Sequence, residues 1–407
     1  MKKIYLDNSA TTPVDKKVLS VMSSYWSKNF GNPSSIHSMG VIAKVALQKA
    51  RKTVADLIGE HDREIVFTSG GTESNNLAIF GLVNNFLKQG KKYSEIHLIT
   101  TEIEHSSVLE CFKELESKSC KVDYLKVDEF GTINLKDLRD LIKPETLLVS
   151  VGYANSEIGV IQPIKEIIKE IRHKRKEFGR DPGQIKSQFD GAGKIRMPYF
   201  HVDASQAGLY LNMNMEELGV DLMTLDAQKI YGPKGVGALY VRDGIKIEPI
   251  MFGGGQEKGI RSGTENIPLI VGMASAFELA QKIKEKESNR LIKIRNYFFE
   301  EVKKVIPNII INGHLENRLP NNINISMPGQ DGEMNVFKLD EAGIVCSSSS
   351  ACASGSGESA VVRKIAEKTN ASKEEINDRA KSTLRFSMGK DTKIQDIKKL
   401  LKILKNI

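Results

Sequence analysis

The sequence predicts an α/β fold in which helices cover a mainly parallel sheet, followed by a second, smaller α+β domain. Three observations support this prediction. Short apolar runs alternate with helical patterns as far as Val241, the alternation stops after about residue 258, and one long helical stretch takes its place. The chain has 407 residues, of which 40 % are hydrophobic and 27 % are charged, so it is long enough for two or three domains.

Seven apolar runs are expected to form the strands of the sheet. They lie at residues 64–68, 96–100, 122–125, 147–151, 199–203, 222–225 and 236–241. Helical patterns are found at residues 106–117, 135–142 and 163–178, and the first run leads through Ser69–Asn76 into another helix. Strands that alternate with helices predict a parallel sheet, and such sheets bind ligands beyond the carboxyl ends of their strands. The polar residues that end these strands are therefore candidates for a functional site.

The smaller domain is predicted from the change of pattern near residue 258. The helical stretch Leu269–Val305 is followed by the segment Asn322–Met327, a Ser/Gly-rich loop and terminal helices. We expect the large domain to span residues 15–258, and the small domain to combine residues 1–14 with residues 259–407.

The net charge of +8 is concentrated in one segment of the large domain. Residues 172–200 contain eight basic and three acidic side chains, and include an aperiodic basic insertion at about 179–197. We interpret this segment as a solvated loop, with an acidic partner as the alternative, and do not expect binding of nucleic acid.

The composition excludes several classes of protein. No run of about 18 apolar residues predicts a membrane span, and residues 1–13 lack the apolar region of a signal peptide. Four cysteines in a chain of this length do not form a disulfide framework, which favours a reducing cytoplasm. Neither a CxxC nor an HExxH motif is present, so no resident metal site is expected.

A carboxylate and a lysine are expected at the ends of two strands. Asp203 lies in the segment His201–Gln206, and Lys229 follows Asp203 by 26 residues, about one strand–helix–strand unit. This pair suits pyridoxal phosphate, because a lysine amine forms a Schiff base with the aldehyde and a carboxylate keeps the ring nitrogen protonated. A buried structural ion pair is the alternative.

The segment Ser69–Ser74 lies between a strand and a helix. Its small residues allow backbone N–H groups to approach an anion at the helix N-terminus, and Thr72 adds a hydroxyl group. An ordinary helix cap uses the same residue types and is the alternative.

Cys352 lies in a run of small and polar residues at 347–357. Such a loop suits an exposed nucleophile, which reacts as the thiolate, and a flexible linker with an incidental cysteine is the alternative. Cys346 follows apolar residues and is expected to be buried, whereas Cys111 and Cys120 are interpreted as structural.

Together these motifs resemble the cysteine desulfurases, members of the class V aminotransferase family with the type I fold of pyridoxal phosphate-dependent transferases. The resemblance covers nearly the whole chain, and the order and number of the motifs make it specific. The matching segments are residues 5–13, 30–35, 67–74, 101–105, 201–206, 229–235, 253–257, 261–266, 350–352 and 385–389. The Ser-rich cysteine loop is similar to that of the group that supplies iron–sulfur cluster assembly.

The resemblance implies a site for pyridoxal 5'-phosphate. Lys229 would hold the cofactor covalently and move protons, Asp203 would pair with the ring nitrogen, and Gln206 would bind the ring oxygen. His105 would stack on the ring and act as an acid or base, with a satisfied polar residue at a helix start as the alternative. The implied cofactor-binding residues are Gly71, Thr72, His105, Asn155, Ser156, Asp203, Gln206, Gln228, Lys229 and Thr264.

The resemblance also implies a reaction in which Cys352, Lys229 and His105 are catalytic. Arg385 would clamp the carboxylate of L-cysteine, with Asn155 as a second contact. Cys352 would attack the substrate sulfur, leaving L-alanine and a persulfide on Cys352. The resemblance implies no resident metal site, with Cys352 at most a transient ligand of an iron–sulfur cluster. Thr264 would reach the phosphate of the other subunit, which implies a homodimer.

Three residues depart from the family pattern. Asp226 and Gln228 replace a serine and a histidine that contact the phosphate, and Ser156 replaces an asparagine that contacts the ring oxygen and the substrate. Asp226 is an anion at a position where a contact to the phosphate is expected.

We therefore expect a cytoplasmic cysteine desulfurase that donates sulfur to an acceptor protein, such as an iron–sulfur scaffold or a tRNA-thiolation protein. One alternative is a selenocysteine lyase or a related lyase or aminotransferase. The other is a non-catalytic binding subunit in which the altered phosphate site has lost turnover.

Overall fold

A computed structural model describes residues 3–179, 197–348 and 357–407 of the chain. Most of the predicted basic insertion lies outside these described residues, as does Cys352.

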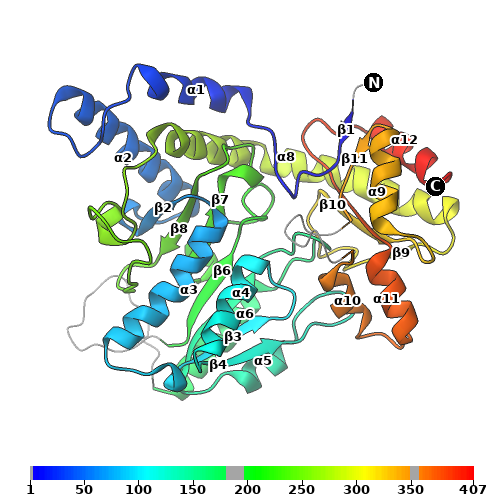
Figure 1. Cartoon of the computed structure of the whole chain (residues 1–407), viewed down its shortest axis with the longest axis horizontal. Helices are drawn as coiled ribbons and strands as arrows, with labels where there is room; N and C mark the ends of the chain where they lie inside the picture. The colour runs from blue at the N-terminus through cyan, green and yellow to red at the C-terminus, as the bar shows by residue number, and fades with distance from the viewer. Residues whose placement is uncertain (1–2, 180–196, 349–356) are drawn as a thin grey trace.

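A seven-stranded sheet forms the centre of the larger part of the molecule (Figure 1). Its strand order is β2–β8–β7–β6–β5–β3–β4, and all neighbouring strands pair in parallel except β8, which is antiparallel to β2 and β7. The strands are β2 (Ile65–Thr68), β3 (His97–Thr101), β4 (Lys121–Leu125), β5 (Thr146–Gly152), β6 (Tyr199–Asp203), β7 (Leu222–Asp226) and β8 (Gly237–Val241). The predicted mainly parallel sheet is confirmed.

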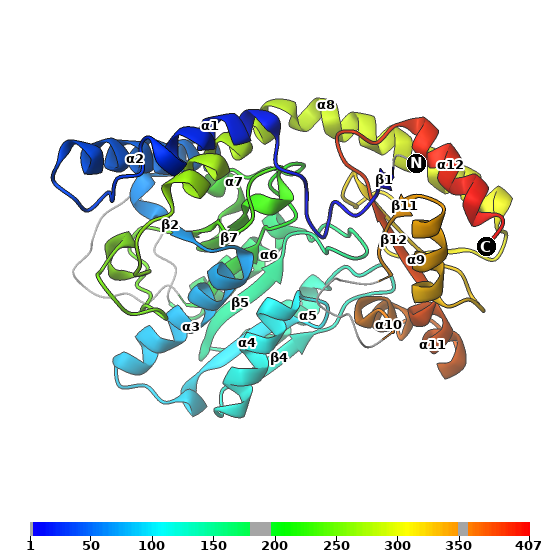
Figure 2. The same ribbon diagram turned by 45° about the horizontal axis from the view of Figure 1, so that its top comes forward.

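Helices cover both faces of this sheet (Figure 2). One face packs against α3 (Gly71–Lys88) and α4 (Ser106–Ser117). The opposite face packs against α2 (Ser38–Ile58), α5 (Leu135–Leu141), α6 (Ile164–Glu177) and part of α8 (Ile267–Val305). Because successive side chains of a strand point to opposite faces, Val66 joins the first layer, whereas Ile65 and Phe67 join the second.

The interpretation of residues 172–200 as a solvated segment is wrong for Arg175, which is buried. This side chain is buried on α6, four residues after the buried Ile171 and therefore on the same helix face. Its guanidinium forms an ion pair with Asp221 at 2.5 Å and donates to the carbonyl of Pro198. One of the eight basic residues is thus part of the core.

The C-terminal elements form a second hydrophobic cluster, to which Leu6 near the chain start contributes. A three-stranded sheet has the order β12–β10–β9, and β1 pairs in parallel with β11. These strands are β1 (Ile4–Tyr5), β9 (Ile310–Ile311), β10 (Asn322–Ser326), β11 (Ile344–Val345) and β12 (Thr383–Ser387). The helices are α9 (Gly332–Glu341), α10 (Ala360–Ala366), α11 (Lys373–Lys381) and α12 (Ile394–Leu404).

The long helix α8 contributes to both hydrophobic clusters, as its predicted length suggests. Residues between Ile267 and Ala280 pack in the cluster of the large sheet, whereas residues between Leu291 and Val302 pack in the C-terminal cluster. The division into domains at residues 14/15 and 258/259 stays a prediction.

The remaining helical elements are short or lie at the edge of the molecule. They are α1 (Lys16–Ser27), α7 (Met215–Leu218) and the 3₁₀ helices Asp62–Glu64, Tyr93–Glu95, Ala227–Lys229 and Glu257–Gly259. In the described ranges, no helix has both the length and the apolar character that crossing a membrane requires.

Candidate active site

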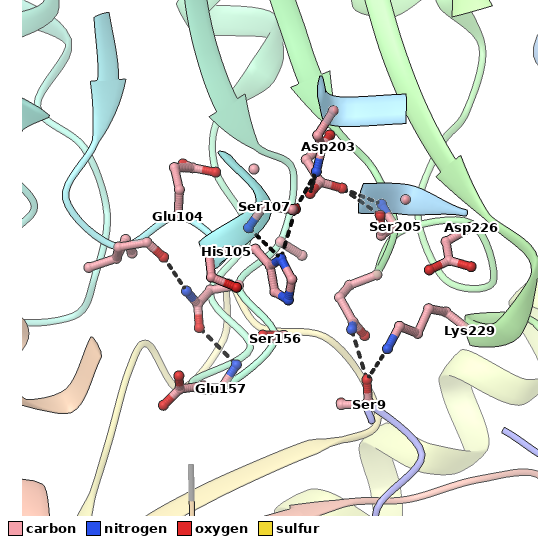
Figure 3. A pocket seen from close by; sticks show the side chains of 18 of the residues that line it. Ser9, Glu104, His105, Ser107, Ser156, Glu157, Asp203, Ser205, Asp226 and Lys229 are labelled. Atoms are coloured by element: carbon pink, nitrogen blue, oxygen red, sulfur yellow. Dashed lines mark hydrogen bonds between the residues drawn. The ribbon is translucent and has the colours of Figure 1, made fainter. Parts of the chain in front are cut away.

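A cavity of about 310 Å³ lies at the carboxyl ends of β3, β5, β6 and β7, next to the N-terminus of α3 (Figure 3). This is the edge at which parallel α/β sheets bind ligands. Ten of the predicted site residues line the cavity: Gly71, Thr72, His105, Asn155, Ser156, Asp203, Gln206, Gln228, Lys229 and Arg385.

Two predicted site residues are not among those that line the cavity. Thr264 is exposed in the loop that precedes α8. Cys352 lies outside the described residues, and the last described residue before it is Ser348. Cys346 is buried as predicted, and the backbones of Ser347 and Arg385 exchange two hydrogen bonds of 2.6 and 3.2 Å.

Asp203 ends β6 and is held by three hydrogen bonds. The backbone N–H and the hydroxyl of Ser205 donate to Oδ1 at 2.9 and 2.6 Å, and the amide of Asn75 donates to Oδ2 at 2.8 Å. An ionised carboxylate only accepts hydrogen bonds, so this donor set suits the charged form. The carboxylate can therefore pair with a cationic ring nitrogen.

His105 is the N-cap of α4 and also lines the cavity. Its Nδ1 accepts from the backbone N–H of Ser107 at 3.1 Å and lies 2.8 Å from the Ser107 hydroxyl. Because Nδ1 is an acceptor, the neutral imidazole carries its proton on Nε2. The helix-cap and active-site interpretations of His105 are thus compatible, since each uses a different ring nitrogen.

Asn75 and Ser107 are site residues that the sequence prediction missed. The Asn75 amide donates to Asp203 and, at 2.8 Å, to the Ser107 hydroxyl, which leaves the hydroxyl proton free to bond His105 Nδ1. This chain of hydrogen bonds joins Asp203 to His105. The only sequence signal was the position of Asn75 one turn into the helix that follows Ser69–Ser74.

Lys229 ends the 3₁₀ helix that follows β7, and its amine lies against the N-terminal segment. Nζ donates to the carbonyl oxygens of Ser9 at 2.8 Å and Ala10 at 2.6 Å. The Gln206 amide donates to the same Ser9 carbonyl at 3.0 Å. Neutral carbonyl groups therefore hold the amine in the cavity, and Ser9 is a further residue that the sequence prediction missed.

Asp226 ends β7 and caps the 3₁₀ helix that carries Lys229. Its carboxylate accepts two hydrogen bonds from Gln228, one from the backbone N–H at 3.2 Å and one from the side-chain amide at 3.0 Å. Burial raises the pKa of this carboxyl above its ordinary value. Asp226 is therefore a weaker acid in the fold than a free aspartate.

The N-terminus of α3 meets Asp226 at one end of the cavity. Gly70 precedes the helix with φ of 149°, and a Cβ atom placed on Gly71 would lie 2.9 Å from Ser205 Oγ and 3.3 Å from Asp226 Oδ2. The first backbone N–H groups of a helix have no partner within it and bind anions. With Thr72 alongside, this end has the donors that a phosphate group needs.

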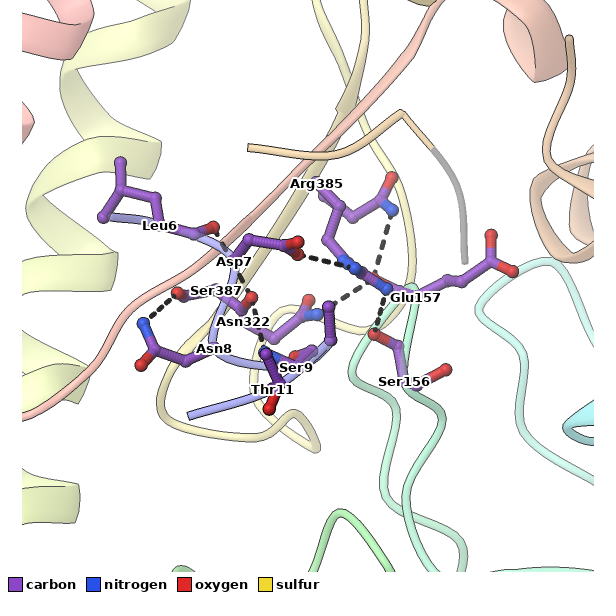
Figure 4. Close-up of polar contacts among 12 residues, drawn as sticks. Leu6, Asp7, Asn8, Ser9, Thr11, Ser156, Glu157, Asn322, Arg385 and Ser387 are labelled. Atoms are coloured by element: carbon purple, nitrogen blue, oxygen red, sulfur yellow. Dashed lines mark hydrogen bonds and ion pairs between the residues drawn. The ribbon is translucent and has the colours of Figure 1, made fainter. Parts of the chain in front are cut away.

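Arg385 of β12 also lines the cavity, and it lies beside Asp7 and Ser156 (Figure 4). Its guanidinium forms an ion pair with Asp7 at 2.8 Å and donates to the carbonyl of Ser156 at 3.3 Å. Its buried Nε has no hydrogen-bond partner among the described residues. The arginine therefore retains donor capacity for a further anionic group.

Asn155 and Ser156 form part of a turn beside Arg385. The Asn155 side-chain oxygen accepts from the backbone N–H groups of Glu157 and Ile158, and its amide donates to the carbonyl of Ile103. The side chain of Asn155 thus fixes the turn in which Ser156 faces the cavity.

Glu104 is a buried carboxyl that also lines the cavity. It accepts from the hydroxyl of Thr101 at 2.6 Å and from the backbone of Gly152, but burial raises its pKa to about 7. The sequence prediction did not include it, because nothing in the sequence reported its burial.

The residues of the cavity fit pyridoxal phosphate. Asp203 and Lys229 approach from neighbouring strands, as the ring nitrogen and the aldehyde require. The lining also includes a helix N-terminus with a glycine cradle and a buried arginine whose Nε–H has no partner among the described residues. Fold and site therefore define a pyridoxal phosphate-dependent enzyme of the type I class.

Comparisons with known proteins agree with this class. The family model of aminotransferase class V matches residues 4–179 and 192–400. The chain is 41 % identical to the cysteine desulfurase IscS of Dictyoglomus turgidum, over all of this chain and 94 % of that protein.

Solved structures give the same result. A NifS-like protein superimposes with a TM-score of 0.86 at 33 % identity, with 99 % of this chain and 98 % of that chain covered. SspA in complex with cysteine superimposes with a TM-score of 0.73 at 32 % identity, with 95 % and 99 % covered. The chain belongs to the class V aminotransferase family and, within it, to the pyridoxal phosphate-dependent cysteine desulfurases. These comparisons support the desulfurase interpretation and not the two alternatives.

Proposed function

We propose that this chain converts L-cysteine to L-alanine, leaves a persulfide on Cys352 and passes that sulfur to an acceptor protein. The single observation that carries the proposal is the cavity in which Lys229, Asp203 and Arg385 meet. The likeness to SspA in complex with cysteine supports the choice of substrate.

When bound, pyridoxal phosphate supplies an aldehyde that links to amines and a ring that withdraws electrons from the substrate. Asp203 would hold the ring nitrogen, because three hydrogen bonds fix its carboxylate. Gln206 would bind the ring oxygen, and Gly71 and Thr72 would bind the phosphate at the N-terminus of α3. His105 would lie against the ring and present its Nε2 proton to the cavity.

Lys229 is the group that would move protons. Its amine is held by two carbonyl oxygens, which are acceptors and leave the nitrogen oriented within the cavity. Once the substrate occupies the site, Nζ of Lys229 can take a proton from the substrate Cα and return it to Cβ.

Arg385 would bind the substrate carboxylate. Its Nε–H is buried without a partner among the described residues, so an incoming carboxylate would satisfy it. Asp7 and the Ser156 carbonyl hold the rest of the guanidinium in place. Ser156 and Asn155 would flank the substrate from the turn beside it.

Cys352 would be the sulfur acceptor, on a loop that we assign to the small domain. Its thiolate would attack the substrate sulfur, so that an S–S bond forms as the C–S bond breaks, and the freed carbon would gain the proton. The balance is L-cysteine plus a Cys352 thiol to L-alanine plus a Cys352 persulfide, with no added oxidant. Thiol exchange then transfers the sulfur to the acceptor.

A homodimer is part of the proposal. Large apolar side chains, among them Trp26, Phe30 and Ile36, are exposed around α1 and α2, and Phe252 is 83 % exposed in a nearby loop. An ion pair between Arg51 of α2 and Glu257 ties that loop to the same surface. Thr264 lies further along this loop, so one partner copy could cover the apolar surface and receive Thr264.

We further propose that the acceptor is an iron–sulfur scaffold or a tRNA-thiolation protein, and that the location is the cytoplasm. The cysteines Cys111, Cys120 and Cys346 are free thiols, which supports a reducing compartment.

The test is release of sulfide and alanine from L-cysteine, in the presence of a thiol reductant and pyridoxal phosphate. The wild type should release both in equal amounts, and Lys229→Ala and Cys352→Ala should release neither. Cys346→Ala is the matched control and should stay active, because burial raises the pKa of that thiol to about 12.

Two outcomes would contradict the proposal. Loss of activity in Cys346→Ala but not in Cys352→Ala would show that Cys346, and not Cys352, accepts the sulfur. Absence of both products, together with absence of bound cofactor, would favour a binding subunit.

A further inference from the structure

Asp226 occupies the end of the cavity where the cofactor phosphate is expected. Its Oδ2 lies 3.3 Å from the Cβ position of Gly71, the first residue of α3. The N–H groups of that helix end attract an anion, so a phosphate bound there would contact the Asp226 carboxyl. Two anionic groups therefore meet at one helix N-terminus.

Burial outweighs the groups around Asp226 that stabilise its charge. Both of its hydrogen bonds come from Gln228, which is neutral. The charged groups that act on it are Lys229, whose ammonium lowers its pKa, and Asp203, whose carboxylate raises it. Burial has the largest effect, so the pKa of Asp226 is raised before any phosphate is present.

A phosphate group would favour the neutral acid still further. The second pKa of a phosphate monoester is about 6, so the free cofactor is a dianion above that pH. A carboxylate and a dianion in contact repel each other, whereas a carboxylic acid donates a hydrogen bond to a phosphate oxygen. Two such groups titrate as a pair, and one proton is retained between them.

We propose that Asp226 binds the cofactor phosphate through one shared proton, so that this chain takes up a proton when it binds pyridoxal phosphate. Asp226 then decides how strongly the site prefers the phosphorylated cofactor over pyridoxal, and this preference declines as the pH rises. The inference rests on the cofactor of the proposed function and adds a role for a residue that departs from the family pattern.

The sign of the pH dependence follows from the proton balance. Where the free cofactor is a dianion and Asp226 is ionised before binding, the shared proton must come from solution, so binding takes up about one proton. The affinity for pyridoxal phosphate then falls by up to about tenfold per pH unit. Pyridoxal carries the same ring and aldehyde but no phosphate, so its affinity lacks this contribution.

The experiment measures the dissociation constants of pyridoxal phosphate and pyridoxal by absorbance titration of the cofactor-free wild type between pH 6 and 9. The ratio of the two constants cancels the titration of Lys229, which both ligands share. Proton uptake is measured separately, from the binding heat in buffers of different ionisation enthalpy. We expect the preference for pyridoxal phosphate to fall at least tenfold over this range, with uptake of about one proton at pH 8.

Asp226→Asn is the decisive variant, because its amide is a permanent donor of nearly the same shape. In this variant, the preference for pyridoxal phosphate over pyridoxal should not change with pH above 7. Binding of pyridoxal phosphate should take up no more protons than binding of pyridoxal does. Asp226→Ser offers a second donor if the first variant folds poorly. Glu104→Gln is the matched control: it removes another titratable carboxyl of the cavity and should keep both wild-type signatures.

A pH-independent preference in the wild type would overturn the inference and leave the proposed function intact. Binding of pyridoxal but not of pyridoxal phosphate would also overturn it, because Asp226 would then exclude the phosphate. Loss of the pH dependence in Glu104→Gln would assign the proton to Glu104 instead. If neither ligand binds, the proposed function fails as well.

Discussion

Two carboxylates of the cavity, Asp203 and Asp226, end neighbouring strands and have similar exposure, yet their surroundings differ. Asp203 accepts three hydrogen bonds from two residues and faces the expected ring nitrogen. Asp226 accepts two hydrogen bonds from Gln228 alone and lies at the anion-binding end of α3. A position at the end of a strand thus places a carboxyl group in the site. The hydrogen-bond donors around that group decide how well its negative charge is stabilised there.

The comparison is tested most strongly by removing the charge at each position. Asp203→Asn should lower kcat/KM for L-cysteine by about 10³-fold, because an amide cannot hold a protonated ring nitrogen. Asp226→Asn should stay within about threefold of the wild type at pH 7 and saturating cofactor. Steady-state sulfide release measures both.

Absorbance of the bound cofactor distinguishes a loss of rate from a loss of cofactor in these two variants. Asp203→Asn should still bind the cofactor, so its loss of rate would not reflect an empty site. Equal losses in the two variants would show that the two carboxylates have the same role, contrary to our interpretation.

Glu104 extends the comparison to a third carboxyl. Its pKa of about 7 in the fold lies above the ordinary 4.5, so the wild type loses stability as the pH rises through 7. Glu104→Gln does not ionise, and should therefore be more stable than the wild type by up to about 3 kcal/mol at pH 9. The difference should shrink toward pH 5.

Urea unfolding at equal cofactor concentration measures this effect. Glu217→Gln provides the control. Glu217 is exposed, and its partner Lys165 lowers the pKa of its carboxyl rather than raising it. An advantage of Glu104→Gln that is the same at pH 5 and pH 9 would exclude titration of Glu104 as its cause.

The smallest expected effect concerns the donors of Asp203. Asn75→Ala removes one hydrogen bond from Asp203 and another from Ser107, and should lower kcat by about tenfold. Asn76→Ala changes the next residue, whose amide donates to the carbonyl of Thr72, and should stay within about twofold of the wild type. A loss in Asn76→Ala as large as that in Asn75→Ala would attribute the effect to helix α3 itself.

The strands and the strand-end residues were predictable because their signals are local. Alternating apolar runs identified all seven strands of the large sheet, and the residues after them included Asp203 and Lys229. The roles of His105 and Arg385 came from the family resemblance, since a single polar residue in a sequence does not report its surroundings.

The supporting residues were not predictable, because their roles depend on contacts between distant segments. Ser9 meets Lys229 across 220 positions of the chain, and Asp7 meets Arg385 across 378. Arg175 was misjudged for the same reason, since its partner Asp221 lies 46 positions further along the chain, just before β7. Sequence patterns report which face of an element is apolar, but not which polar groups meet there.

The long helix α8 has a consequence for how the chain can be divided. A 39-residue helix is about 58 Å long, and this one gives apolar side chains to both hydrophobic clusters. Cutting the chain before it would strip the large sheet of Ile270 and Phe277, which cover one of its faces. Neither fragment would be an autonomous module, so the two halves of this enzyme must be inherited, exchanged and engineered as one unit.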